Sequence, residues 1–225
     1  MIIIIGLIGN FIPFFLISWS EQYIQSNTAG LLLSVAPIFT LLLSHYFTKD
    51  DKFTLLKFIS IIVGLVGVLF IIGIDTLESL ISGNQKTIIP KIAIILSALG
   101  YVISSILAYN LKKITIMTLT TLVTISAALI SIPFMIYVEI YFPSSFNQKS
   151  LLSIIYLGLF PTAIAFQLRF YIISKAGPIF LSYVAYLIPG FAILWGYLFL
   201  NERINLDTLI GVTLILIGVF ISQKK

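Results

Sequence analysis

The stretch PTAIAFQLRFYIIS, which begins at Pro161, carries Gln167 and Arg169 in a run that is otherwise largely apolar. A guanidinium binds carboxylates and similar anions, which makes Arg169 the first candidate for solute chemistry. An arginine at the membrane midplane costs about 2.5–3.5 kcal/mol on insertion scales, whereas near the interface its long stem lets the charge reach water. We expect Arg169 near the cytoplasmic face, as a topology anchor, at the inner mouth of a pathway, or bonded to a partner inside a helix bundle.

Gln167 follows the same helix but points about 200° away from Arg169, so both cannot face one narrow cavity. It is a candidate for an interhelical hydrogen bond or for substrate contact. Glu21 lies beside Trp19 in a segment typical of an interfacial aromatic belt. Glu21 is therefore either a carboxylate on the rim or a proton or cation site at the outer mouth.

Two tyrosines lie beside stripes of small residues, which let membrane helices approach closely. Tyr101 follows the stripe that contains Ser97, Gly100, Ser104 and Ala108, and Tyr186 follows the stripe that begins at Ser182. Each tyrosine either lines an aqueous cavity with its hydroxyl or anchors helix packing.

The composition of the chain identifies the solvent around these side chains. Of 225 residues, 60% are hydrophobic and only 9% are charged, far from the balance of a soluble domain. The chain has no cysteine and one histidine, so it lacks clustered ligands for a metal and the acid–base groups of an enzyme site. We expect neither enzyme activity nor a cofactor or bound metal. The net charge of +5 is read as loop charge that sets membrane topology, not as a nucleic-acid patch.

Charged and turn residues divide the chain into apolar runs that are long enough to cross a bilayer as helices. We predict eight spans, near residues 2–21, 28–47, 53–73, 89–111, 117–141, 151–173, 178–200 and 206–222. The runs do not alternate as barrel strands do. The predicted fold is an all-α polytopic membrane protein.

The basic residues are unevenly divided between the two sets of loops and ends. One set carries Lys49, Lys52, Lys57, Lys112, Lys113, Lys175, Lys224 and Lys225, and the other carries Lys86, Lys91, Lys149 and Arg203. The positive-inside rule therefore places both termini in the cytoplasm.

The stretch that begins at Pro161 has an earlier counterpart, PFFLISWSEQYIQS, which begins at Pro13. Each is followed by an apolar helix with one proline (Pro37 and Pro189), a charged turn (TKDDK and NERIN) and a glycine-bearing helix. The two series start at the first and the sixth span, so they cross the membrane in opposite directions. Inverted repeats are typical of secondary transporters, whose substrate site lies between the halves. The four paired prolines are candidate kinks or gating points.

The chain resembles the EamA-type transporters of the drug/metabolite transporter superfamily. The resemblance is carried by SWSEQYIQSNTAGLLLSVAP in the first copy and by KAGPIFLSYVAYLIPGFAILWGYLFLNERI and LIGVTLILIGVF in the second. It implies two five-helix repeats, a prokaryotic inner membrane and small substrates such as amino acids, related metabolites or drugs. Here the first two helices of that pattern are not found. We expect a first copy of three helices at 1–74, an external connector at 75–88 and a second copy of five helices at 89–225.

The predicted function is export or exchange of small polar metabolites by alternating access. The alternative is a truncated remnant that does not transport, or a membrane partner subunit. The expected partners are the lipid bilayer and a small-molecule substrate, with a homodimer left open and nucleic acid not expected.

Overall fold

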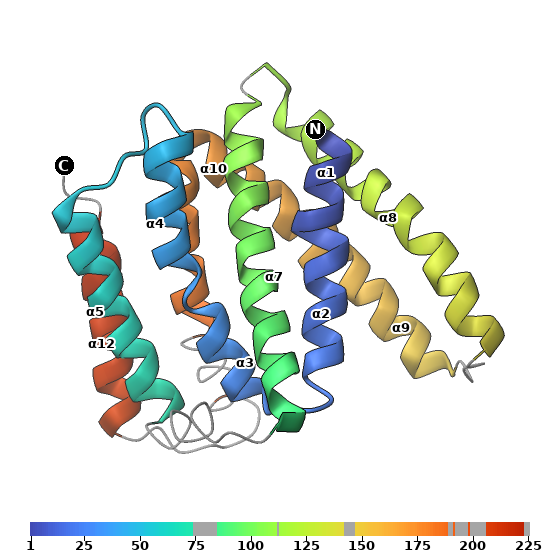
Figure 1. Cartoon of the computed structure of the whole chain (residues 1–225), viewed down its shortest axis with the longest axis horizontal. Helices are drawn as coiled ribbons and strands as arrows, with labels where there is room; N and C mark the ends of the chain where they lie inside the picture. Colours follow the sequence, from blue (N-terminus) through green and yellow to red (C-terminus); the bar gives the residue numbers. More distant parts are fainter. Residues whose placement is uncertain are drawn as a thin grey trace.

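Helices make up nearly all of the regular structure in the computed structural model, which describes residues 1–73, 85–111, 113–141, 147–188, 191, 198 and 206–222. Figure 1 shows them as a bundle in which the start of the first helix and the end of the last helix lie at the same end, beside the loops that follow Phe47 and Asn110. Among the described residues, six helices are long and apolar enough to cross a membrane. The prediction of an all-α polytopic membrane protein is confirmed.

The first half of the chain supplies three of these spans. The first runs through α1 (Ile2–Gly6), the π-helical η1 (Leu7–Phe11) and α2 (Ile12–Ser20). The second consists of α3 (Ser26–Leu33) and α4 (Ala36–Phe47), and the third is α5 (Leu55–Ile72). These bounds agree with the predicted spans to within a few residues.

The second half begins with two long helices, α7 (Gln85–Asn110) and α8 (Ile116–Tyr141). α7 starts four residues before the predicted position, because the polar residues Gln85, Lys86 and Thr87 extend the helix beyond its apolar run. The next segment is formed by α9 (Gln148–Leu157), the π-helical η2 (Gly158–Ile164) and α10 (Ala165–Ser182). The last helix is α12 (Leu206–Ser222), which has the bounds predicted for the eighth span.

The helix assigned as α10 contains a real break at Gly177. Its backbone has φ 87° and ψ 167°, a conformation that is unfavourable for residues with a side chain. Pro178 follows directly, and proline is common in the first turn of a helix. The chain therefore ends one helix before Gly177 and starts another at Pro178, as predicted from the boundary between the spans 151–173 and 178–200. Most of the second of these spans, including Pro189, lies outside the described residues.

The helices α5 and α12 form a tightly packed pair at one side of the bundle (Figure 1). A Cβ atom added at Gly67 would lie 2.6 Å from the carbonyl oxygen of Gly211, and one at Gly218 would lie 2.7 Å from that of Ser60. Without a hydrophobic drive in lipid, such close backbone contact supplies dispersion energy between helices.

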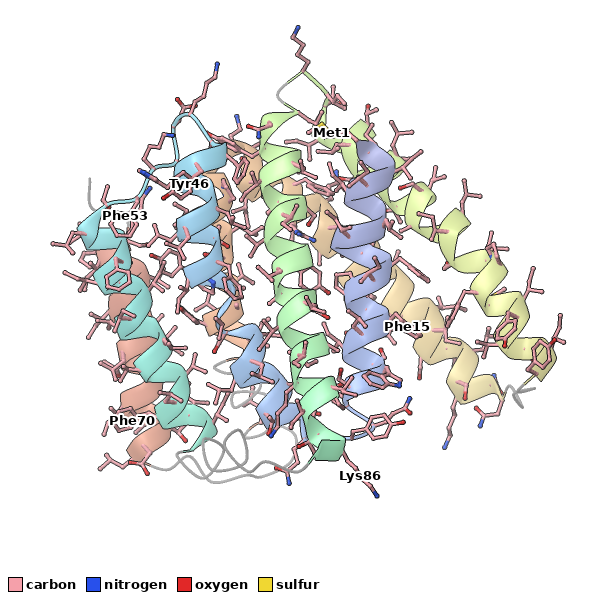
Figure 2. All side chains as sticks on the ribbon, in the orientation of Figure 1. Met1, Phe15, Tyr46, Phe53, Phe70 and Lys86 are labelled. Carbon is pink, nitrogen blue, oxygen red and sulfur yellow. The ribbon has the colours of Figure 1, made fainter. Side chains whose placement is uncertain are left out.

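α7 occupies the centre of the bundle, where it packs against α2, η1, α3, α4 and α10. A Cβ atom added at Gly100 of α7 would lie 2.4 Å from the carbonyl oxygen of Ile8 in η1. The predicted packing role of the small-residue stripe along this helix is thereby confirmed. Figure 2 shows large side chains such as Phe53 and Phe70 around the outside, where a membrane protein meets lipid.

Candidate functional site

A cavity of about 480 Å³ lies between the two predicted copies. Leu33, Ala36 and Thr40 of α3 and α4 line it from the first copy. Its remaining lining comes from the second copy: Ala98, Tyr101, Val102, Ser105, Pro161, Ala165, Phe166, Leu168, Arg169, Ile172, Pro178, Leu181, Ser182, Val184, Ala185 and Ile188. The described walls are therefore mostly apolar, and among these described lining residues Arg169 is the one with a charged side chain.

The Arg169 guanidinium is bonded inside the bundle. Its Nη2 donates to the Ser104 Oγ at 2.8 Å, the Ser105 Oγ at 3.0 Å and the Tyr101 carbonyl at 3.1 Å, all on α7. Its Nη1 donates to the Gly9 carbonyl in η1 at 3.3 Å. Gly9 lies about 12 Å along the first span from Met1, at a rise of 1.5 Å per residue.

These bonds differ from those expected of a topology anchor. An anchor would direct its charge to the interface, whereas Arg169 directs it to carbonyls and hydroxyls of neighbouring helices. The third alternative given by the sequence, a structural partner inside the bundle, describes the observed bonds.

Aromatic rings also surround the Arg169 charge. The guanidinium carbon lies 5.3 Å from the ring centre of Tyr101, 5.2 Å from that of Phe166 and 5.9 Å from that of Phe170. Ring faces attract cations, and this attraction is stronger where water is excluded. The rings and carbonyls together make a buried positive charge tolerable.

Pro13 explains why the Gly9 carbonyl is available to Arg169. Proline has no N–H to donate to the carbonyl four residues earlier, which for Pro13 is that of Gly9. The helix widens into the π-turn η1 just before this proline. Arg169 then supplies the missing donor from the second copy.

The same problem recurs at Pro161, the counterpart of Pro13, and is solved locally. Pro161 leaves the Leu157 carbonyl without its usual donor, and the Thr162 hydroxyl donates to that oxygen at 3.0 Å. Pro161 also lies within a π-helical segment, η2. π-turns inside membrane-length helices are frequent at functional sites, and here they occur at paired positions.

The other predicted pathway residues do not line this cavity. Gln167 is exposed and donates to the Met117 sulfur at 3.4 Å, an interhelical contact. Glu21 is exposed at the end of α2, and the Trp19 ring packs against Tyr23 with 5.2 Å between ring centres. Of the predicted pathway residues, Tyr101 and Arg169 are brought together at the cavity.

Tyr186 is fully buried and serves in packing. Its hydroxyl donates to the Ile61 carbonyl at 3.1 Å. Its ring packs directly against Gly64, since a Cβ atom added at Gly64 would lie 2.5 Å from a carbon of the Tyr186 ring. It belongs to the core formed by α3, α4, α5, α12 and the segment after Pro178. Pro37 lies in the first turn of α4, directly after the turn at Ser34 and Val35 that divides the second span.

Sequence reasoning missed a polar cluster at the end of the bundle that holds the termini. Asp51, which is 8% exposed, forms an ion pair with Lys57 at 2.8 Å. Its other oxygen accepts a hydrogen bond from the backbone N–H of Ile179. The charged turn TKDDK contains Asp51, but the sequence alone gave this turn only a place in the predicted repeat and in the membrane topology.

The fold and the cavity define a multi-pass α-helical membrane protein with a solute-sized space between its halves. The chain belongs to the EamA-like transporter family, which matches residues 1–73 and 89–223. It is a membrane transporter of the drug/metabolite type.

Two proteins with similar sequences are named as uncharacterized transporters. One is YoaV of Bacillus subtilis, 23% identical over 92% of this chain and 70% of its own length. The other is from Archaeoglobus fulgidus, 28% identical over 98% of this chain and 76% of its own length. A crystal structure with 17% identity has a TM-score of 0.81 and covers 98% of this chain and 74% of that one, which shows a shared fold.

Proposed function

We propose that this protein exports or exchanges small polar metabolites by alternating access, with both termini in the cytoplasm of a cell whose inner membrane it spans. The observation that carries the proposal is the cavity of about 480 Å³ between the two predicted copies. Substrate sites of inverted-repeat transporters lie at that place, between the halves near the midplane. A volume of this size falls within the range of small-molecule sites.

The paired prolines support the rocking motion that alternating access needs. Pro13 and Pro161 each interrupt the hydrogen bonds of their helix, and each lies next to or within a π-turn. Because these interruptions occupy equivalent places in the predicted copies, a bend at one can be matched by a bend at the other.

Counterflow in liposomes tests the proposal. Purified protein would be reconstituted with one unlabelled amino acid or related metabolite inside, and uptake of the labelled compound would be followed across a panel. We expect transient accumulation of at least one compound above the level in protein-free liposomes. Absence of counterflow across the panel, with the protein shown to be folded by its circular dichroism and monodispersity, would reject transport by these residues.

The exposed surface of α9 favours a second candidate, a membrane partner subunit. No residue of α9 or η2 is buried against the rest of the described chain. Such a face fits lipid or another membrane protein. Native mass measurement of the protein extracted in mild detergent distinguishes the two: a stable second subunit supports the partner role, and a single chain supports lipid contact.

A further inference from the structure

We propose that the cavity binds a small organic anion whose carboxylate contacts Arg169 and whose apolar body lies against the surrounding side chains. This inference rests on the proposed transport function, because it names the substrate class of the same cavity.

The charge of Arg169 lacks a counter-anion within the described part of the chain. Within the described residues its partners are carbonyls, hydroxyls and ring faces, and none is a carboxylate. A charge in a low-dielectric interior is costly unless it is paired. A bound anion would supply that pairing, whereas a cationic ligand would be repelled.

The donors left free at the cavity match an acceptor-only group. Among the described residues, the Nε–H and the second Nη1 hydrogen of Arg169 have no partner. The described residues likewise offer no partner to the Tyr101 hydroxyl. An ionised carboxylate only accepts hydrogen bonds and can bind the edge of a guanidinium with both oxygens.

The serine and threonine hydroxyls of the lining are already used as donors. Ser105 donates to the Tyr101 carbonyl at 2.7 Å, Thr40 to the Ala36 carbonyl at 2.8 Å, and Ser182 to the Ile179 carbonyl at 2.6 Å. Each of these bonds returns to the same helix, which is usual for hydroxyls within membrane helices. The free donors of the site are therefore concentrated on Arg169 and Tyr101.

The rest of the lining fits an apolar body of moderate size. Phe166, Leu168, Ile172, Val184 and Ile188 present hydrocarbon to the cavity. Burial of apolar groups against such surfaces is favourable, and these side chains offer no hydrogen bond to a second polar group of the ligand. The ligand class is thus a carboxylate that carries an aliphatic or aromatic side group.

The test compares carboxylates with their uncharged amides on the wild-type protein in detergent. Acetate, isovalerate and phenylacetate would each be paired with the corresponding amide, and phenethylamine would represent a cation with an aromatic body. Binding would be measured by isothermal titration and by the shift in unfolding temperature. We expect isovalerate and phenylacetate to bind roughly tenfold or more tightly than their amides, since a charge-assisted bond is lost. Equal binding of each pair, or preference for phenethylamine, would overturn the proposal.

Two variants locate the effect. Arg169→Gln should weaken phenylacetate binding by about tenfold or more, whereas Lys175→Gln removes the same charge from an exposed position of α10 and should leave it unchanged. Equal losses in the two variants would mean that net charge, not the cavity, attracts the anion. If Arg169→Gln does not fold, Tyr101→Phe keeps the ring, removes the hydroxyl and should weaken carboxylates more than amides.

The outcome is distinguishable from failure of the transport proposal. Binding of carboxylates without counterflow of any compound would keep the site and reject transport. Counterflow of a solute that is insensitive both to Arg169→Gln and to competing phenylacetate would keep transport and reject this ligand class.

Discussion

Asp51 and Ile179 join the two predicted copies: the Asp51 Oδ2 accepts a hydrogen bond from the backbone N–H of Ile179 at 2.9 Å. Ile179 lies in the first turn of the helix that begins at Pro178, where backbone N–H groups have no partner within the helix. Asp51 therefore caps a helix that is distant in sequence. Lys57 binds the other carboxylate oxygen at 2.8 Å and holds the side chain in position.

Asp51→Ala should lower the free energy of unfolding by about 1–2 kcal/mol, the usual cost of losing a helix cap. The expected loss would be measured by reversible unfolding in mixed micelles. Asp50→Ala is the matched control, because Asp50 is exposed and accepts a long hydrogen bond, at 3.4 Å, from the Tyr109 hydroxyl on a neighbouring helix, so its loss should cost clearly less than that of Asp51, about 0.5 kcal/mol. Asp51→Asn keeps an oxygen acceptor and should fall between the two. Equal stability of Asp51→Ala and the wild type would show that the cap does not contribute.

Pro13 and Arg169 should be coupled energetically through the Gly9 carbonyl. Pro13→Ala restores an N–H that can donate to Gly9, so removal of Arg169 would no longer leave that oxygen without a donor. A double-mutant cycle of Pro13→Ala and Arg169→Gln should give an interaction energy of about 1 kcal/mol, with Arg169→Gln less costly in the alanine background.

The control for this cycle is Pro133→Ala, which alters a proline within the α-helix α8 that has no assigned π-turn. Its effect should add to that of Arg169→Gln without interaction. Simple additivity for Pro13 as well would contradict the link between proline and arginine.

The positions of the spans could be predicted from sequence because charges and turns interrupt otherwise apolar runs. The predicted span 206–222 has the same bounds as α12, and the predicted break before Pro178 occurs at Gly177. These features are local, since the cost of placing backbone or charge in lipid acts on each segment separately. The packing of the small-residue stripe that contains Gly100 could also be predicted, because small residues on one helix face let a neighbouring helix approach closely.

The arginine site could be predicted only in part. The sequence shows the apolar run around Arg169 but not the acceptors that other helices bring to it, so the sequence leaves the anchor, pathway and partner roles open. Gly9 and Ser104 are far from Arg169 along the chain, yet both bond to it. The sequence shows that the Gly9 carbonyl lacks its usual N–H donor, because residue 13 is a proline. Which side chain replaces that donor depends on three-dimensional packing. For Tyr186, the small residues beside it in the sequence are compatible with either a packing role or a cavity role. The close contact of its ring with Gly64 shows that it packs between helices.

Gly67→Ala should destabilise the protein, whereas Gly158→Ala should not. A Cβ atom at Gly67 would meet the Gly211 carbonyl oxygen at 2.6 Å and the Ile215 side chain at 2.9 Å, so α5 and α12 would have to separate. Overpacking of this kind should cost about 2 kcal/mol. At Gly158 nothing lies within 4 Å, and alanine should be neutral or stabilise the helix by up to about 1 kcal/mol. Thermal unfolding in one detergent measures both, and an unchanged melting temperature for Gly67→Ala would contradict the close contact.

Single cysteines should report the orientation of the chain in the membrane, because the native sequence has none. Lys49 lies in the loop after α4, at the end that holds the termini, and Lys149 lies at the opposite end, in the first turn of α9 (Figure 1). Both side chains are exposed, so either position accepts a thiol without loss of packing. With the termini in the cytoplasm, a membrane-impermeant maleimide added to intact cells should label Lys149→Cys and leave Lys49→Cys unlabelled until the membrane is opened. The reverse pattern would place the termini outside and contradict the positive-inside assignment. Labelling of both would indicate a dual orientation, which the two-to-one excess of basic residues at one end argues against.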